Sequence, residues 1–419
     1  MQQLLVAHSA LVATSITSSL RYYRLSFLFV SNDGNILSYG SEDVIICPNY
    51  EYGTVIDCKG GAVLPGFTDA HTYPVWGGDR EDDFFQKVAG ASYMELSDNV
   101  NSSDLDYTVE RTANASEDSL YASTLERIRS MASKGTTTIE CKTDYSLNWA
   151  TEKKILRVLT RLKREIPLDI SITYFAASIL PKNSTTDAIV EDVVNTRLPD
   201  LQSSIENGEI IVDNVDVRCA EGVFNVEQSR QILSKAQAMG LKLNFHAESI
   251  SNGSSAQLAA SLMARAVSHL DEMSPAGVAA LTSSRTAAVL LPTTTLLLRH
   301  QPPPAIAIAQ AGVPIALGTD FRANLFCTSM PIVMYLACTT LGMTLEQAIT
   351  AATINAAYSI GLSHRLGAIT EGRQGDFVVI NTRRWENIIF RLGESQDLIE
   401  YVIKKGRIIY SKATGHVIF

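Results

Sequence analysis

The stretch TTTIECKTDYSLNWATEKKILRVLTRLKREIPLDISITYF, residues 136–175, decides the fold class. It opens with an apolar run (136–142) and closes with a second one (168–175). Between them, residues 151–166 have helical periodicity, and we expect Thr151 to be the N-cap of that helix. Such a unit predicts two parallel strands joined by a covering helix.

The same unit recurs along the middle of the chain. Further strand-like runs occupy residues 210–219, 241–248, 265–270, 287–293 and 314–321. Helical patterns at 119–135 and 225–240 each end at a glycine, as helices often do. About eight such units favour a closed α/β barrel of the (β/α)8, TIM-like type over an open doubly wound sheet. No GxGxxG follows the first strand, which argues against a dinucleotide-binding fold.

Both ends of the chain are rich in short strand-like runs. They lie at 24–30, 35–40, 54–60 and 62–67, and again at 375–382 and 398–411. Neither end is long enough to form a robust core alone, so we expect them to pair into one small β-sandwich. The predicted domains are therefore a composite sandwich, 1–66 with 365–419, and a barrel, 67–364.

Composition narrows the class of protein. The chain has 419 residues, 46% of them hydrophobic, and carries a net charge of −9 without any dense Lys/Arg run, which argues against nucleic acid or an anionic membrane as partner. Its six cysteines show no CxxC spacing, so we expect a reduced, cytoplasmic protein. The apolar residues 1–20 contain no Lys or Arg, and we interpret them as a strand or a poorly ordered leader instead of a signal peptide. No apolar run reaches the ~18 residues of a membrane span.

Four residues stand at the ends of separate strand-like runs: His71, His246, His269 and Asp320. A barrel of this kind has its active site at the carboxyl ends of its strands. One histidine in such a place is usually structural, but three of the chain's seven histidines together with an aspartate indicate a metal site. Neutral imidazoles and a carboxylate suit Zn²⁺ or Fe²⁺, which lowers the pKa of bound water toward ~7. Asp320 could bind the ion or take the proton from that water.

Several segments resemble those of the imidazolonepropionase family. They are PGFTDAHTYPVWGGDREDDFFQKVAGASYMEL (65–96), GTTTIECKTDYSL (135–147), LKLNFHAES (241–249), AVSHLDEMS (266–274), LLPTTT (290–295), GTDFRAN (318–324), SMPIVMYLAC (329–338) and AATINAAY (351–358). They occur in the family's order, and the similarity covers roughly residues 24–410. The resemblance implies an amidohydrolase-type barrel that hydrolyses a C–N bond of 4-imidazolone-5-propanoate to N-formimino-L-glutamate, in histidine degradation. It also implies one zinc or iron ion and a homodimer.

The resemblance assigns metal and catalytic roles by position. His71 matches the first histidine of the family's HxH metal pair, His246 the next ligand, and Asp320 the last ligand, which also acts on the water. His269 matches the catalytic histidine that polarises the ring carbonyl and steadies the oxyanion.

Two further residues match substrate-binding positions. Arg80 would bind the propionate carboxylate, a task that suits a bidentate guanidinium, although a surface salt bridge within DREDD is the plainer interpretation. Tyr145 would hydrogen-bond the substrate.

The chain departs from the family at the site itself. Tyr73 replaces the second histidine of the HxH pair, and a phenol with a reference pKa of ~10 is a poor ligand. Ser249 falls where the family has its catalytic glutamate, and it cannot act as an acid or base near neutrality. Glu248 could replace it only through a local bulge, because its side chain should project to the opposite face of an extended segment.

Other family positions are also altered. The glycine-rich loop reads NVNSS (99–103), the loop before Ser146 keeps only Tyr145, and Ser178 stands in place of a second substrate-binding histidine. We therefore carry two hypotheses from different classes. One is a metal-dependent cyclic amidohydrolase with a weakened site, and a further option is a redirected hydrolase that uses Tyr73 as an oxygen ligand. The other is a catalytically inactive paralogue, with its ion lost or weakly held, that binds a small molecule or a partner subunit.

Overall fold

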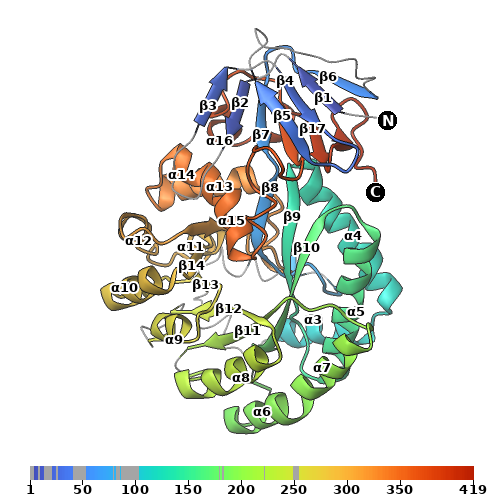
Figure 1. Ribbon diagram of the computed structural model, residues 1–419. Helices are drawn as coiled ribbons and strands as arrows, with labels where there is room; N and C mark the ends of the chain where they lie inside the picture. Colours follow the sequence, from blue (N-terminus) through green and yellow to red (C-terminus); the bar gives the residue numbers. More distant parts are fainter. Residues whose placement is uncertain are drawn as a thin grey trace.

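The computed structural model describes residues 4–7, 10–13, 21–24, 27–40, 53–78, 80–81, 85, 103–178, 180–181, 184–220, 222–248 and 254–419. Figure 1 shows parallel strands surrounded by helices, with a separate group of strands at one end of the molecule, where both termini lie.

Eight strands form one parallel sheet in which each strand pairs with its neighbour in the sequence. They are β8 (Phe67–Thr72), β9 (Thr136–Lys142), β10 (Asp169–Ala177), β11 (Asn214–Cys219), β12 (Lys242–Ala247), β13 (Ala266–His269), β14 (Ala287–Leu290) and β15 (Ile315–Leu317). The first strand and the segment after the last one meet through a parallel bridge between Thr72 and Phe321. The Asp320 amide donates to the His71 carbonyl at 3.0 Å across this seam. The sheet is therefore a nearly closed barrel, which confirms the predicted fold class.

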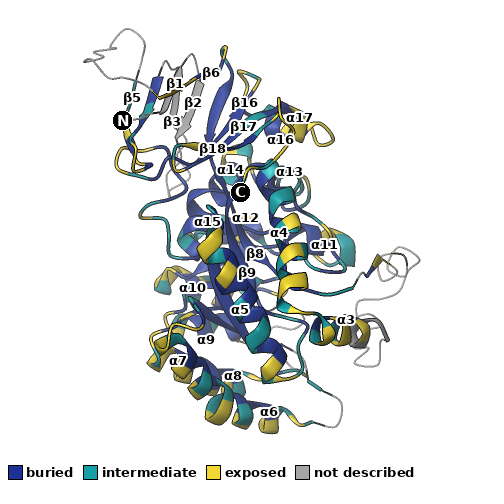
Figure 2. Ribbon diagram, turned by 90° about the vertical axis from the view of Figure 1, so that its right-hand side faces the viewer, coloured by how far each residue is buried: buried dark blue, intermediate teal, exposed yellow. Residues whose placement is uncertain are grey.

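Helices cover the outside of the barrel. They are α3 (Ser103–Asn114), α4 (Glu117–Ser133), α5 (Trp149–Glu165), α6 (Thr186–Asp192), a π-helical turn (Val193–Arg197), α7 (Leu198–Glu206), α8 (Val226–Ala238), α9 (Ser255–Ser261), α10 (Pro275–Ser284), α11 (Pro292–Leu298), α12 (Ala305–Gln310), α13 (Met330–Thr340), α14 (Leu345–Ala351) and α15 (Ile354–Ser359). Their inward faces are buried, and their exposed residues lie on the outer surface (Figure 2). Within the described part of the chain, no helix has the length and apolar character needed to cross a membrane.

The predicted N-cap of α5 was wrong. Asn148 is the N-cap, and its side chain accepts a hydrogen bond from the Thr151 amide at 3.0 Å. Thr151 is instead the donor in the first turn. Asparagine ranks above threonine as an N-cap, so Asn148 three residues upstream was the better candidate.

The strands near the two termini form two further sheets. The six-stranded sheet has the order β18-β17-β16-β7-β2-β3, and the four-stranded sheet has the order β5-β4-β1-β6. Their bounds are β1 (Leu4–Ala7), β2 (Ala10–Ala13), β3 (Arg21–Arg24), β4 (Phe27–Val30), β5 (Ile36–Gly40), β6 (Thr54–Asp57), β7 (Ala62–Pro65), β16 (Phe377–Ile380), β17 (Ile399–Lys404) and β18 (Arg407–Ser411), with two short helices, α16 (Asn387–Phe390) and α17 (Ser395–Leu398), beside them.

These two sheets share one apolar core. Leu28 and Ile56 of the four-stranded sheet belong to the same buried cluster as Phe377 and Ile403 of the six-stranded sheet. Because β7 from the first part of the chain pairs with β16 from the last part, both termini build the same β-sandwich, as the sequence predicts.

A buried ion-pair group joins the sandwich to the barrel. The Lys404 ammonium group, at the end of β17, lies 2.5 Å from Asp169 Oδ2, at the start of β10, and 2.7 Å from Asp376 Oδ2. Arg365 Nη2 lies 2.6 Å from the other Asp169 oxygen. Burial opposes ionisation of Asp169, but Lys404 and Arg365 outweigh it and hold the pKa of this carboxyl well below its usual value.

We expect Asp169→Asn to lower the free energy of unfolding by about 3 kcal/mol, because it leaves the buried Lys404 with one partner fewer. A carboxyl whose pKa is depressed by folding adds stability above its unfolded pKa and loses it as the pH falls. The difference between the two proteins, measured by urea unfolding, should therefore shrink below about pH 4. Asp118→Asn, which breaks a pair between Arg161 and an 89% exposed carboxylate, is the control and should change little. An equal loss in both variants would contradict a special role for the buried pair.

Candidate metal centre

The four residues predicted from the strand ends lie together at one mouth of the barrel. The centroids of the His71 and His246 rings are 5.1 Å apart, and those of His246 and His269 are 4.9 Å apart. One nitrogen from each of the three histidines falls within a set whose members lie within 4.8 Å of one another. Asp320 is adjacent, with Oδ1 3.8 Å from His71 Nε2.

Local backbone geometry aims these side chains into the mouth. His269 and Asp320 have φ values of 75° and 50°, in the left-handed region that residues other than glycine seldom adopt. Backbone strain of this kind is concentrated at functional sites. Gly318 allows β15 to end against β8, because a Cβ there would lie 2.7 Å from the His71 Cβ.

The three histidines are held in the neutral form. Burial lowers the pKa of His71 and of His246 well below the usual value, and neighbouring cationic groups add to the effect. Burial, followed by the charges of Arg322 and Arg218, lowers the pKa of His269 to about 3. Neutral imidazole is the form that binds a metal ion, so no imidazolium has to be deprotonated before an ion can bind here.

Sequence reasoning missed the charged group beneath the histidines. His246 Nδ1 lies 2.9 Å from Asp216 Oδ2, and the Lys142 ammonium group lies 2.9 Å from both Asp216 Oδ2 and Glu140 Oε1. All three charged side chains are fully buried. A carboxylate that holds the second nitrogen of a histidine fixes the orientation of the ring. The alternation of Glu140 and Lys142 on one strand was the available signal, because residues i and i+2 share a face.

The Tyr73 hydroxyl lies between two of the expected metal ligands. It is 3.1 Å from His71 Nε2 and 2.7 Å from His246 Nε2, and the side chain is only 3% exposed. The Phe175 ring stacks on His246 at 4.7 Å between centroids, which holds that imidazole in place. The Tyr73 phenol therefore hydrogen-bonds the two nitrogens that would coordinate the ion according to the family pattern.

The proton positions in this chain of contacts follow from its acceptors. A carboxylate can only accept, so His246 Nδ1 donates to Asp216 and His246 Nε2 accepts from the Tyr73 hydroxyl. The Tyr73 oxygen then accepts from His71 Nε2–H. His71 Nδ1, which carries the lone pair in this tautomer, has no hydrogen-bond partner in the described part of the chain. Burial, together with the charge of Asp216, raises the pKa of Tyr73 well above its usual value.

Arg80 and Tyr145 are both buried near this mouth. The Tyr145 hydroxyl accepts from the Ala323 amide at 3.0 Å and keeps its own proton for another acceptor. Burial raises the pKa of Asp144, and Arg218, Arg322 and Arg80 oppose that rise, which places Arg80 in the field of the site. Arg80 is thus buried and not on the exposed surface that the plainer interpretation assumed, and its contact with the substrate stays a prediction.

Two further cations border the histidines. Arg322 Nη2 lies 3.4 Å from Asp320 Oδ2, and Arg218 follows Asp216 by two residues on β11, on the same face of the strand. Both arginines lower the pKa of His269. These arginines stand beside Asp216 and Asp320 and could bind an anionic group of a small molecule.

Glu248 does not replace the missing glutamate. Its Oε1 accepts from the Ala256 amide at 3.4 Å, and a Cβ on Gly277 would lie 3.3 Å from its Oε2, so the carboxylate faces the starts of α9 and α10. The backbone at Glu248 is not extended, with a φ of 48°, so the side chain is directed away by a left-handed residue and not by strand alternation. Ser249 and residues 99–102 lie outside the described residues. Ser178 is buried and donates to Asp144 at 3.4 Å.

A nearly closed parallel barrel with histidines and an aspartate at the carboxyl ends of its strands defines the amidohydrolase class. The model of the Amidohydrolase family matches residues 62–409 of this chain. Two probable imidazolonepropionases are similar along nearly their whole length. The *Xenopus tropicalis* protein is 46% identical over 385 residues, covering 91% of this chain and 89% of its own. The *Homo sapiens* protein is 43% identical over 401 residues, with 95% and 94% covered. The chain belongs to the imidazolonepropionase family.

Solved structures agree on the fold. An adenosine deaminase from *Xanthomonas campestris* with bound zinc superposes with a TM-score of 0.75 at 17% identity, covering 100% of this chain and 94% of that one. A guanine deaminase from *C. acetobutylicum* with bound guanine gives 0.74 at 14% identity, with 98% and 100% covered. At these identities the likeness concerns the barrel and sandwich architecture alone.

The residues present suit a divalent metal ion. Three neutral imidazoles meet, and Asp320 Oδ1 has no hydrogen-bond partner among the described residues, so this donor set fits zinc or iron. The compact trio includes His269, whereas the family pattern names His71, His246 and Asp320 as ligands. Tyr73 competes with an ion for this site, because its hydroxyl occupies hydrogen-bond positions on two of the nitrogens.

Proposed function

We propose that the protein is a cytoplasmic, metal-dependent hydrolase that opens a small cyclic amide. The substrate is 4-imidazolone-5-propanoate, whose C–N hydrolysis gives N-formimino-L-glutamate in histidine degradation. The observation that carries this proposal is the meeting of three neutral histidines with an Asp320 oxygen that has no hydrogen-bond partner among the described residues. The 46% identity to a probable imidazolonepropionase supports the choice of substrate.

Each residue near the mouth has a task in this reaction. His71, His246 and Asp320 would hold one zinc or iron ion, which when bound lowers the pKa of water and supplies a hydroxide nucleophile. Asp320 Oδ1 can accept the proton that the attacking water gives up, because no described residue donates to it. The neutral His269 ring can donate a hydrogen bond to the ring carbonyl as negative charge develops on its oxygen.

The substrate's propionate chain calls for a cation. Arg80 is the candidate from the family pattern, and Arg218 and Arg322 add positive charge to the same region. A planar guanidinium binds a carboxylate through two parallel hydrogen bonds, which fixes both position and orientation.

A second candidate function rests on Tyr73. Its hydroxyl hydrogen-bonds both His71 and His246, and this arrangement favours a protein that holds its ion weakly and binds a small anion without turning it over. The two functions differ in metal content and in turnover, so one preparation of the purified protein tests both.

We expect the purified protein, loaded with zinc or iron, to hydrolyse 4-imidazolone-5-propanoate. The loss of the substrate's ultraviolet absorbance measures this reaction. Asp320→Asn and His269→Asn should each lower kcat by about 10²–10⁴-fold, the range for loss of a positioned acid or base. Lys235→Glu, a change of an exposed residue on α8, is the matched control and should leave kcat unchanged. If the wild-type protein, fully loaded with metal, showed no turnover, the proposed hydrolase function would be rejected and the binding function would remain.

A further inference from the structure

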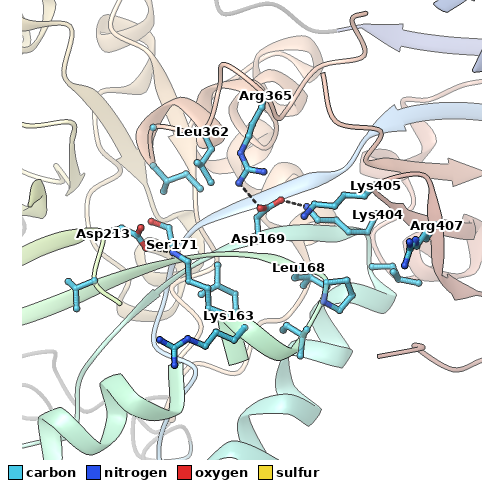
Figure 3. A pocket seen from close by; sticks show the side chains of 18 of the residues that line it. Lys163, Leu168, Asp169, Ser171, Asp213, Leu362, Arg365, Lys404, Lys405 and Arg407 are labelled. Carbon is cyan, nitrogen blue, oxygen red and sulfur yellow. Dashed lines mark hydrogen bonds and ion pairs between the residues drawn. The ribbon is translucent and has the colours of Figure 1, made fainter. Parts of the chain in front are cut away.

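A second site candidate lies at the opposite ends of the barrel strands. A cavity of about 1100 Å³ is bordered by the segments that lead into β10, β11 and β12, and by the β17–β18 hairpin of the sandwich. We call it the basic cleft, and Figure 3 shows Lys405 and Arg407 of the hairpin beside the Asp169 ion pairs. Because the histidines stand at the carboxyl ends of the strands, the basic cleft is separate from the candidate metal centre.

The basic cleft is lined by more cationic than anionic side chains, although the whole chain is acidic. Eight Lys or Arg residues and three Asp residues line it, although the whole chain carries a net charge of −9. Three of the cations have carboxylate partners. Lys163 pairs with Asp213 at 2.6 Å, and Arg365 and Lys404 both pair with Asp169.

Five cations in the basic cleft remain without a carboxylate partner among the described residues: Arg164, Lys242, Arg265, Lys405 and Arg407. Arg164 donates to the carbonyl of Gly208. Lys242, Lys405 and Arg407 are exposed. Like charges brought to one cavity repel one another, so a multiply charged anion placed between them would be held by several contacts at once.

Arg265 is a fixed anchor within this group. Its Nη1 donates to Asn214 Oδ1 at 3.2 Å and to the Ile360 carbonyl at 3.1 Å, which leaves Nε and Nη2 without an acceptor among the described residues. Burial lowers the pKa of Arg265, and Asp213 offsets this only in part. Gly361 makes room for the guanidinium, because a Cβ there would lie 2.5 Å from its central carbon.

Part of the cavity wall is apolar. Ile166, Leu168, Ile360 and Leu362 all line the cavity, so a ligand with an organic body fits better than a bare inorganic ion. A phosphate ester carries close to two negative charges at neutral pH and matches Lys and Arg clusters. We propose that the basic cleft binds a phosphorylated small molecule of nucleotide size, with its phosphates toward Arg265 and the β17–β18 hairpin.

Calorimetric titration of the full-length protein with ATP, pyrophosphate, adenosine and citrate tests this proposal. ATP and pyrophosphate should bind saturably at one site and more weakly as salt is raised, because screening weakens charge contacts. Adenosine, which lacks phosphate, should not bind at the same concentrations. Tighter binding of citrate than of pyrophosphate would overturn the assignment to phosphates, and no saturable binding of either phosphate compound would overturn the site.

Variants locate the binding. Lys405→Glu combined with Arg407→Glu should weaken ATP binding by about 10-fold or more, and Lys242→Glu should weaken it independently. All three residues are exposed, so these variants should fold, and circular dichroism checks this. Lys235→Glu makes the same charge change as Lys242→Glu outside the basic cleft and should leave the affinity unchanged. Undiminished ATP affinity in the hairpin variant would place the anion elsewhere, for example at the arginines of the barrel mouth, and overturn the proposal. Turnover of the imidazolone is not involved in any of these measurements.

Discussion

Tyr73→His should raise the affinity for zinc by more than about 100-fold, because loss of even an outer partner of a metal ligand typically costs 10–100-fold. In the structure the Tyr73 phenol donates to His246 Nε2 and accepts from His71 Nε2. Its raised pKa keeps it a neutral hydrogen-bonding group, whereas an imidazole at this position would offer a lone pair. Competition with a coloured chelator measures the affinity directly.

Tyr73→Phe separates the two causes of weak binding. It removes the hydroxyl without adding a ligand, so its zinc affinity should stay well below that of Tyr73→His. If the two variants bound zinc equally tightly, the hydroxyl would have acted only by blocking the nitrogens. If the wild type already bound zinc as tightly as Tyr73→His, Tyr73 would be an effective ligand, and the prediction would be wrong.

Lys142→Met should lower the free energy of unfolding by about 3–5 kcal/mol, the cost of removing one partner from a buried ion pair. The ammonium group lies 2.9 Å from Glu140 and 2.9 Å from Asp216, and none of the three side chains is exposed. Without it Glu140 and Asp216 lose the ammonium group that pairs with both of them in the barrel interior. Urea unfolding measures the loss, and Lys153→Met, which removes a part-exposed pair with Asp200, is the matched control with a much smaller effect.

The pH dependence of the Lys142→Met variant gives a second test. Burial raises the pKa of Glu140 to about 7 even with Lys142 present to oppose it, and removal of Lys142 raises it further. A carboxyl whose pKa is higher in the folded protein takes up a proton on folding, so its cost falls as the pH falls. The deficit of the variant should therefore shrink from about pH 9 to about pH 6. If the difference in free energy of unfolding were constant over this range, the variant would be destabilised by lost packing and not by the carboxylates left without Lys142.

Much of the fold and part of the candidate site could be predicted from the chain itself. The alternation of apolar strands and helices indicates a parallel barrel, and His71, His246 and Asp320 stand at strand ends, where a barrel brings distant segments together. The capping error at Thr151 arose because two acceptable caps lie three residues apart, and only the hydrogen bond from the Thr151 amide to Asn148 distinguishes them.

Contacts between strands were beyond the reach of pattern reasoning. Lys142, Asp216 and His246 belong to β9, β11 and β12, and their register decides that their charged atoms meet. The position of Arg322 depends on the left-handed backbone at Asp320, which no local periodicity encodes. The departure at Tyr73 was visible in the sequence, but its hydrogen bonds to two histidines required coordinates.

The contact between the first strand of the barrel and the segment after the last one closes the barrel and also positions two expected metal ligands. The backbone bond from the Asp320 amide to the His71 carbonyl closes the ring, and the side chains of the same two residues face each other at 3.8 Å. Any fluctuation that parts the first strand from the last therefore also separates two expected ligands. Conversely, an ion coordinated by both residues would link the first strand to the segment after the last one and oppose opening of the barrel.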